Sequence, residues 1–189
     1  SSIPLLISFL LGNNQLGIYN VADRIKSISS QLVHPISHSI FPKMAKEYSK
    51  DKASGNKYLK LILIVLTSIT LISYLLINLY INAIISYFSN ENIILISGVL
   101  RILLFSFIIN VLEEIMVNQY MIPNSMYSSI NKVKFLILSI SIFTCIPLIQ
   151  NYDIKGAALA NVIAEFSGLI YLISIYNKTK KISFKKPSF

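Results

Sequence analysis

Polar side chains recur at intervals of three and four residues along a stretch, residues 16–42, that is otherwise patterned as a helix. Residues at these spacings share one helical face. The face consists of Asn20, Asp23, Ser27, Ser30, His34 and Ser37. The stretch is long enough to cross a bilayer, but lipid does not solvate such a face. We expect it to form a polar wall against a cavity or a partner surface.

The charged residues of this stretch also allow a structural interpretation. Asp23, Arg24 and Lys26 would then lie at the level of the lipid headgroups and pair with one another or with lipid phosphate. A charge at the bilayer centre costs about 2.5 kcal/mol or more. Placement at the headgroups and placement against a cavity or a partner surface both avoid that cost, and the sequence leaves both placements open.

A second polar face is expected on the stretch 93–121, and a lone acid on the last apolar stretch. The polar positions of the first are Arg101, Ser106, Asn110, Glu113, Glu114 and Asn118. Glu165 stands among apolar residues beside the small residues Ala160, Ala164 and Gly168, whose spacing of four favours close helix packing. Each of these polar groups either forms hydrogen bonds between helices or belongs to a proton-sensitive site.

Motifs for enzyme or metal chemistry are absent from the sequence. It has no glycine-rich phosphate loop and no recognisable Ser, His and Asp set. His34 and His38 have the i, i+4 spacing of a metal pair, but Pro35 lies between them and no HExxH glutamate is present. The sequence therefore predicts no enzyme, no cofactor and no metal site.

Composition points to a membrane as the solvent for most of the chain. Of the 189 residues, 54% are hydrophobic and 13% are charged, against roughly 45–50% and 25% in globular domains. Cys145 is the single cysteine, so no disulfide forms within the chain. We predict an all-α, polytopic transmembrane helix bundle over residues 1–177. Its helices are expected at about 1–11 (partial), 16–42, 60–87, 93–121, 133–150 and 156–176.

The formal charge of +9 is explained by topology rather than by nucleic-acid binding, which we exclude. Thirteen of the 17 Lys and Arg residues lie in the segments 43–60, 122–134 and 178–189. These segments are alternate connectors, and the connectors between them hold only Lys155. Because cytoplasmic loops carry the excess of Lys and Arg, we expect five crossings, with a basic cytoplasmic C-terminal tail at 178–189.

Four segments resemble the C-terminal lobe of Wzx-type polysaccharide flippases, in the multidrug/oligosaccharidyl-lipid/polysaccharide exporter superfamily. They are LGIYNVADRI at 16–25, SIFPKMAKEY at 39–48, NQYMIPNSMY at 118–127 and KGAALANVIAEFSGLIY at 155–171. The resemblance implies twelve helices in two six-helix lobes. This chain would supply the second lobe, with its first helix partial, and we expect it to begin inside a longer protein that also contains the N-terminal lobe.

The function implied by the resemblance is movement of an undecaprenyl-pyrophosphate-linked oligosaccharide across the bacterial inner membrane, for O-antigen or capsule synthesis. On that interpretation Arg24 and Arg101 contact the anionic head, since guanidinium pairs well with phosphate oxygens. The other substrate-binding candidates are Asn20, Ser27 and His34. Candidates for coupling to H⁺ or Na⁺ are Asp23, Glu113 and Glu165.

Three alternatives remain open at this stage. A multidrug exporter of the same superfamily would favour an acidic cavity, whereas the polar faces here mix acids and bases. A membrane enzyme of polysaccharide assembly usually carries long extramembrane loops, and the non-cytoplasmic loops expected here are only about five residues long. A structural subunit would bury its polar faces against another chain.

Overall fold

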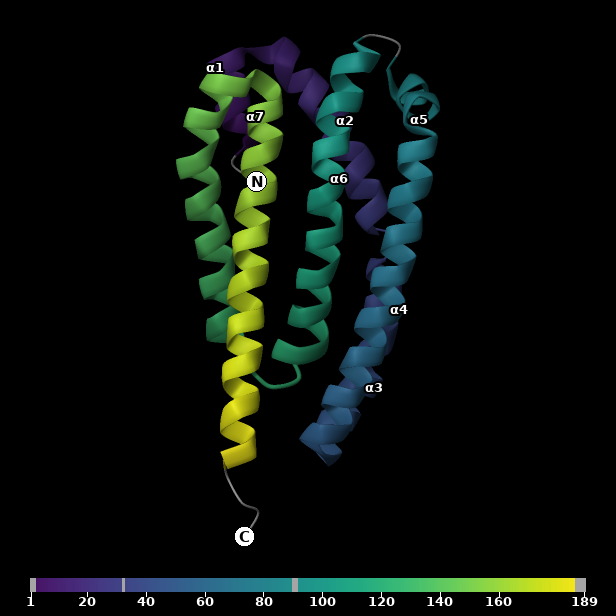
Figure 1. Ribbon diagram of the computed structural model, residues 1–189, viewed down its shortest axis with the longest axis vertical. Coiled ribbons are helices and arrows are strands. Elements are labelled where there is room, and N and C mark those ends of the chain that lie inside the picture. The colour runs from purple at the N-terminus through teal and green to yellow at the C-terminus, as the bar shows by residue number, and fades with distance from the viewer. Residues whose placement is uncertain (1–2, 32, 90–91, 186–189) are drawn as a thin grey trace.

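The computed structural model describes residues 3–31, 33–89 and 92–185, with side chains described through residue 179 (Figure 1). Every regular element in these ranges is helical. The elements are α1 (Ile3–Leu11), α2 (Asn13–Gln31), α3 (His34–Lys50), α4 (Lys52–Leu79), α5 (Ile81–Phe88), α6 (Ile93–Met116), the π-helical turn η1 (Val117–Met121) and α7 (Tyr127–Lys185). The predicted all-α class is confirmed for the described residues.

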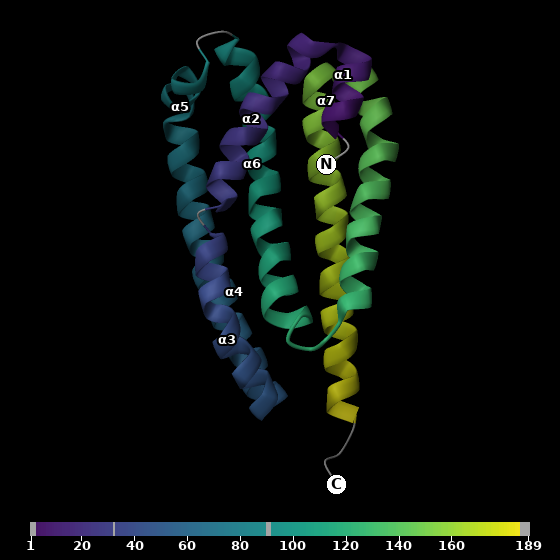
Figure 2. The same cartoon turned by 180° about the vertical axis from the view of Figure 1, so that it is seen from behind.

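Helix α6 is the centre of the bundle. It packs against α2, α4 and α7, while α3 packs on α4 and α1 packs on α2 and α7 (Figures 1 and 2). Leu100, Leu103, Leu104 and Phe107 of α6 are fully buried. A helix with apolar side chains over several faces is stable only where neighbours cover it, which is the position that α6 occupies.

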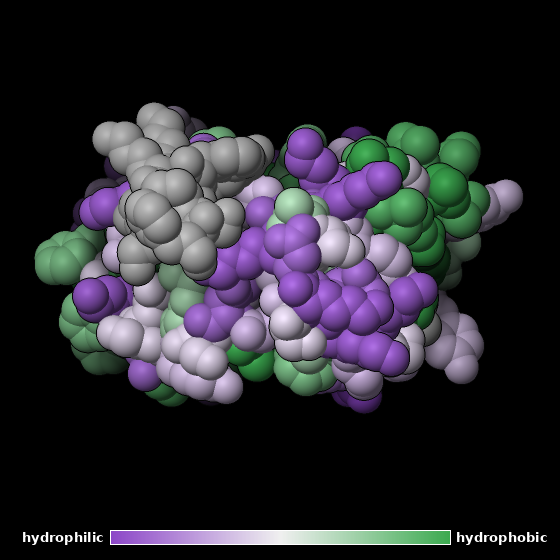
Figure 3. Space-filling view, turned by 90° about the horizontal axis from the view of Figure 1, so that it is seen from below, coloured by the Kyte–Doolittle hydropathy of each residue, from purple (hydrophilic) through white to green (hydrophobic). Residues whose placement is uncertain are grey.

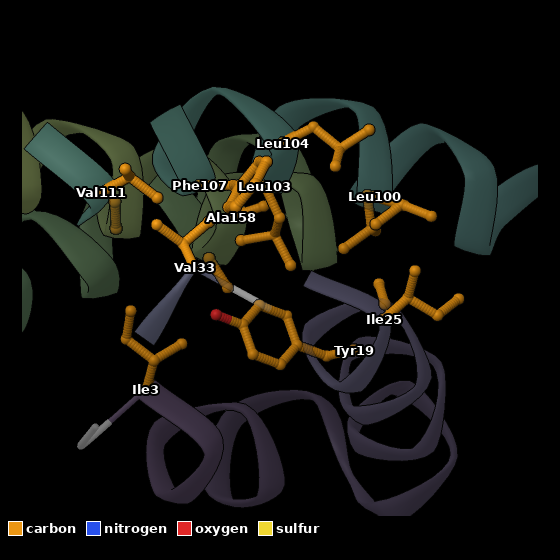
Figure 4. Packing of buried hydrophobic residues seen from close by; sticks show 14 of the residues in the cluster. Ile3, Tyr19, Ile25, Val33, Leu100, Leu103, Leu104, Phe107, Val111 and Ala158 are labelled. Carbon is orange, nitrogen blue, oxygen red and sulfur yellow. The ribbon is translucent and has the colours of Figure 1, made fainter. Parts of the chain in front are cut away.

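Tyr19 joins the short N-terminal helices to this centre. It is 2% exposed, and Figure 4 shows its ring among Ile3 of α1, Val33 and side chains of α6. Ile18, Ala22 and Ile25 are buried along the same side of α2. The apolar face of α2 therefore packs on α6, which leaves its polar face pointing elsewhere.

Helix α7 is a hairpin with two long arms. Asp153 has φ 50° and ψ −138°, a conformation that no helix contains, and the arms before and after it run side by side in opposite directions (Figures 1 and 2). Gly156 makes this turn tight, since a Cβ there would overlap the carbonyl group of Leu148. The separate helices predicted at 133–150 and 156–176 correspond to the two arms, both of which extend further than predicted.

The single helix predicted over 16–42 is wrong. Helix α2 ends at Gln31 and α3 begins at His34. Val33 lies in a turn between them, and its N–H donates to the carbonyl of Ser30 (3.0 Å). Pro35 explains the break. It lacks an N–H and its ring collides with the carbonyl four residues earlier, yet it is tolerated in the first turn of a new helix.

Two other predicted bounds also change. The helix expected at 60–87 begins earlier, at Lys52, and is interrupted at Tyr80, so that it forms α4 and α5. Helix α7 continues through Lys185, so the described part of the predicted tail 178–189 is helical; residues 186–189 lie outside the described ranges. The helix expected at 93–121 matches α6 and η1 together.

Three helices in the described ranges are long and apolar enough to cross a membrane: Lys52–Leu79, Ile93–Met121 and Tyr127–Thr179, the last being the hairpin. α2 and α3 are not among them. The outward faces of α4 and α7 carry large exposed apolar side chains, including Ile64, Ile72, Leu79, Phe143 and Phe166. Such a surface suits lipid and not water.

The segments that carry most of the basic residues lie at one end of the molecule. The corner between α3 and α4, the turn between η1 and α7, and the end of α7 at Lys185 share the lower end in Figures 1 and 2. Hydrophilic atoms gather at this end (Figure 3), where Lys46, Lys50, Lys52 and Lys57 are exposed. The connectors that are rich in Lys and Arg in the sequence therefore lie together at one end of the structure.

Candidate functional site

A polar cavity of about 360 Å³ lies between the α2–α3 break, α6 and the first arm of α7. It is the candidate functional site because titratable and amide side chains converge on it from elements far apart in the sequence. Its lining residues are Ser30, His34, His38, Asn110, Val111, Glu113, Glu114, Val117, Asn118 and Lys134.

The break before α3 places two histidines at the cavity. Pro35 occupies the first turn of α3, where its missing N–H has no intrahelical acceptor, so His34 and His38 remain one helical turn apart on one face. Their rings stack with centroids 6.3 Å apart and planes 17° apart. Proline between the two histidines therefore does not separate them.

Gln119 of η1 holds α3 in place. Its Nε2 donates to the carbonyl oxygen of Ser37 (2.7 Å) and lies 3.2 Å from the Ser37 Oγ, and both side chains are fully buried. The π turn contains one residue more than an α turn, which alters the direction of its side chains. The wall that carries the histidines is thereby attached to the end of α6.

Glu114 of α6 faces the histidines across the cavity. Its Oε1 lies 2.8 Å from Nδ1 of His34 and 3.4 Å from Nδ2 of Asn118, which donates to it. The His34 side chain is 48% exposed and that of Glu114 17% exposed. The pair is thus accessible from the cavity, while Asn118 orients the carboxyl group.

Glu113 occupies a more enclosed position. It is 6% exposed, and its Oε1 has no hydrogen-bond partner within the described part of the chain. Gly168 makes room for it, because a Cβ at that position would overlap Glu113 Oε1 and the Ile137 side chain. A buried carboxyl oxygen without a donor is costly, which sets Glu113 apart from acids with a purely structural role.

A second polar cluster joins α6 to the second arm of α7, and its hydrogen bonds are closed on one another. Ser106 Oγ donates to Glu165 Oε2, and Asn161 Nδ2 donates to Ser106 Oγ (2.9 Å). All three residues are buried. We call Ser106, Asn161 and Glu165 the closed cluster, and its geometry is that of a polar link between packed helices.

The polar wall predicted from residues 20 to 37 does not exist as one face. Asn20 and Arg24 are exposed, and Asp23 pairs with Lys26 at 2.9 Å.

Of the predicted substrate-binding residues, His34 lines the cavity, whereas Asn20, Arg24, Ser27 and Arg101 do not. Among the predicted coupling residues, Glu113 lines the cavity, Glu165 belongs to the closed cluster, and Asp23 lies outside both. The functional roles assigned to these residues stay predictions.

His38, Glu114, Asn118 and Lys134 are cavity residues that the sequence did not assign to a site. The only signal for His38 was its spacing from His34, which was discounted because of Pro35. Nothing local to α6 indicates that Glu114 faces α3, since that contact depends on how the helices pack.

In comparisons with known proteins, no family model, no curated protein and no solved structure matches this chain.

Proposed function

We propose that this chain is a lobe of a membrane transporter that moves a lipid-linked oligosaccharide across the bacterial inner membrane. The observation that carries the proposal is the polar cavity bounded by α3, α6 and α7, two of which are of membrane-spanning length. Polar and ionisable groups at such a position mark substrate and ion pathways. The four segments that resemble Wzx-type flippases give the substrate class.

The cavity chemistry suits the head group of such a lipid. The amides of Asn110 and Asn118 and the carboxyl group of Glu113 offer donors and acceptors for sugar hydroxyls, and Lys134 offers a cation for phosphate oxygens. Its volume of about 360 Å³ is at the lower end of the range for ligand pockets. This lobe would therefore hold part of the head group, and the N-terminal lobe implied by the resemblance would cover the rest.

The hydrocarbon tail would stay outside the protein. Exposed apolar side chains cover α4 and α7, so a polyprenyl chain passing along them exchanges one hydrocarbon neighbour for another. Glu113, whose Oε1 has no donor in the described part of the chain, is the coupling residue that we favour, with H⁺ as the ion, because a proton satisfies a buried carboxyl group.

The topology proposed with this function places the basic end in the cytoplasm. The α3–α4 corner, the turn at 122–126 and the C-terminus would then face inward, in agreement with the distribution of Lys and Arg. Single cysteines would be introduced in a Cys145→Ser background and labelled from outside the cell. Cysteines that replace Asn92 and Tyr152 should react, and cysteines that replace Ser49 and Ser125 should not.

A second candidate is a multidrug exporter of the same superfamily. Two carboxyl groups, Glu113 and Glu114, line the cavity, and an acidic wall suits an organic cation. Lys134 on the same wall weakens that interpretation, since it repels a cation and attracts phosphate.

Complementation separates the two candidates. The full-length protein would be expressed in a bacterium that lacks its polysaccharide flippase, with surface glycan and inner-leaflet lipid-linked oligosaccharide measured together. Restored surface glycan with a falling inner-leaflet pool supports the flippase, and Glu113→Gln should abolish the rescue while Glu47→Gln, at the exposed corner, preserves it. No rescue with any matched sugar pathway, together with resistance to cationic drugs, would favour the exporter.

A further inference from the structure

The cavity wall holds a group of side chains that neither the sequence motifs nor the transport proposal explains. His34, His38 and Glu114 each offer one ligand atom, and these atoms all lie within 4.8 Å of one another. The histidines come from the first two turns of α3, and the glutamate comes from α6. The carboxylate ligand is thus supplied by a different helix from the one that carries the histidines.

We propose that His34, His38 and Glu114 bind a divalent transition-metal ion, with Zn²⁺ the preferred ion, which links α3 to α6. Two imidazoles and one carboxylate form a donor set typical of zinc sites that keep an open coordination position. Mg²⁺ and Ca²⁺ prefer oxygen ligands throughout, so neither matches this set.

The geometry requires little rearrangement. Tetrahedral Zn²⁺ with bonds of 2.0–2.2 Å places its ligand atoms about 3.4 Å apart. The His34 Nδ1 and Glu114 Oε1 are 2.8 Å apart, and the widest separation in the group stays within 4.8 Å. Both histidines are exposed, so rotation of their rings can close the remaining distance.

The surroundings support the ligands as metal sites require. Asn118 Nδ2 donates to the Glu114 carboxyl group at 3.4 Å, and hydrogen bonds of this kind orient a ligating carboxylate. The charges that line the cavity are those of Glu113, Glu114 and Lys134. The Glu114 carboxylate, which is itself a member of the ligand cluster, offsets the charge of the lysine whichever protonation state Glu113 has.

One consequence concerns the fourth coordination position. Three protein ligands leave a position open to water or to an anionic ligand, and here it faces the cavity. Ion binding would also fix the distance between α3 and α6, which are otherwise connected near this point through Gln119 and Ser37. The inference depends only on this cluster and holds whichever substrate the cavity accepts.

The test is direct metal binding by the full-length protein, purified in detergent and stripped with a chelator. Zn²⁺ binding would be measured by calorimetry, and Co²⁺ binding by visible absorption, which reports four-coordinate geometry. We expect one ion bound at this site, Mg²⁺ unable to displace it, and a metal-dependent rise in Tm. This chain contains no other histidine, and its one cysteine, Cys145, is buried and outside the cavity.

Substitutions locate the site. His34→Gln, His38→Gln and Glu114→Gln should each weaken Zn²⁺ binding by more than about 100-fold, while Asn118→Ala should weaken it about 10-fold or somewhat more, as loss of an outer-shell partner does. Glu47→Gln, on α3 but outside the cavity, is the matched control and should retain binding. His38→Gln is the safest variant for folding, because the His38 ring is exposed and stacks only on His34 among its described ring contacts.

Two results would overturn the proposal. One is the absence of saturable Zn²⁺ or Co²⁺ binding by the parent protein at millimolar metal. The other is binding that persists unchanged in His38→Gln and in the His34→Gln, His38→Gln double variant, each shown to be folded by its elution volume and helical circular dichroism.

Discussion

Two buried polar regions share helix α6 and differ in how their polar groups are satisfied. The closed cluster of Ser106, Asn161 and Glu165 pairs its members with one another across the α6–α7 interface. Two turns further along α6, Glu113 and Glu114 face a cavity, and Glu113 Oε1 has no donor in the described part of the chain. Satisfied groups hold helices together, whereas unsatisfied groups beside a cavity are available to a ligand.

The contrast between the closed cluster and the cavity distinguishes Glu165 from Glu113, two acids that look alike in the sequence. Glu165 stands alone in an apolar stretch and is a predicted coupling residue, and its hydrogen bonds are those expected of a structural link. Glu113 and Glu114 are adjacent, but they point to different surroundings, one enclosed beside Gly168 and the other toward His34. Each of the following changes tests this division, in order of its expected effect on the free energy of unfolding.

Gly156→Ala should have the largest effect, because both regions need the α7 hairpin. The added methyl group overlaps the Leu148 carbonyl group, which is backbone and has no rotamer to adopt. We expect a loss at or above about 3 kcal/mol, measured by unfolding of the purified protein in a denaturing detergent. Gly17→Ala is the matched control, since nothing lies within 4 Å of its Cβ, and an equal loss there would contradict the explanation.

Glu165→Ala should break the closed cluster and cost about 2 kcal/mol, since it leaves the buried Ser106 hydroxyl, to which Asn161 donates, without its acceptor. Glu165→Gln keeps an acceptor oxygen for Ser106 and should cost much less. Unfolding free energy and transport per folded molecule are the measurements. A loss of transport in Glu165→Gln at normal stability would place Glu165 with the functional acids.

Gln119→Ala should loosen the wall of the cavity at a cost of about 1 kcal/mol. It removes the hydrogen bonds from η1 to the Ser37 carbonyl and hydroxyl oxygens. Hydrogen exchange of α3 should then increase while that of α7 stays unchanged. Equal increases in both helices would mean that Gln119 supports the bundle as a whole.

Glu47 provides a small, pH-dependent contribution at the exposed α3–α4 corner. Hydrogen bonds from Ser54 (2.6 Å) and Lys50 (3.3 Å) lower the pKa of the Glu47 carboxyl group. The contribution is therefore complete above the unfolded-state pKa of about 4.3, and it is lost as the pH falls through the lower folded-state pKa. The parent should be more stable than Glu47→Gln at neutral pH, and the difference should vanish in acid.

Glu113→Gln should change the free energy of unfolding less than any other variant here that alters the buried regions, because the two side chains have nearly the same shape and no donor to Glu113 Oε1 is lost. Substrate movement, by contrast, should stop. The flippase assay and the unfolding assay together decide the outcome. A large loss of stability with transport intact would reverse the contrast between the two regions.

The sequence predicted the apolar helices and the alternation of basic connectors, because both depend on local composition. The sequence did not predict the features that depend on how the helices pack or on where the backbone breaks. Pro35 separates α2 from α3, so a helical projection that runs from Asn20 to Ser37 combines residues of two helices. Glu114 meets His34 only because α3 is held against η1, and no pattern within either helix contains that contact.

The π turn at the end of α6 also has a consequence for sequence alignment. The N–H of Ile122 bonds to the carbonyl of Val117, five residues earlier, at 3.0 Å, so the chain gains one residue over a regular α-helix. Any homologue with an unbroken helix here would need a one-residue gap between Met116 and Ile122, and a gap placed before Glu113 would shift Glu113 and Glu114 out of phase. Deleting one residue from the turn should convert it to α-helix and rotate Gln119 away from Ser37.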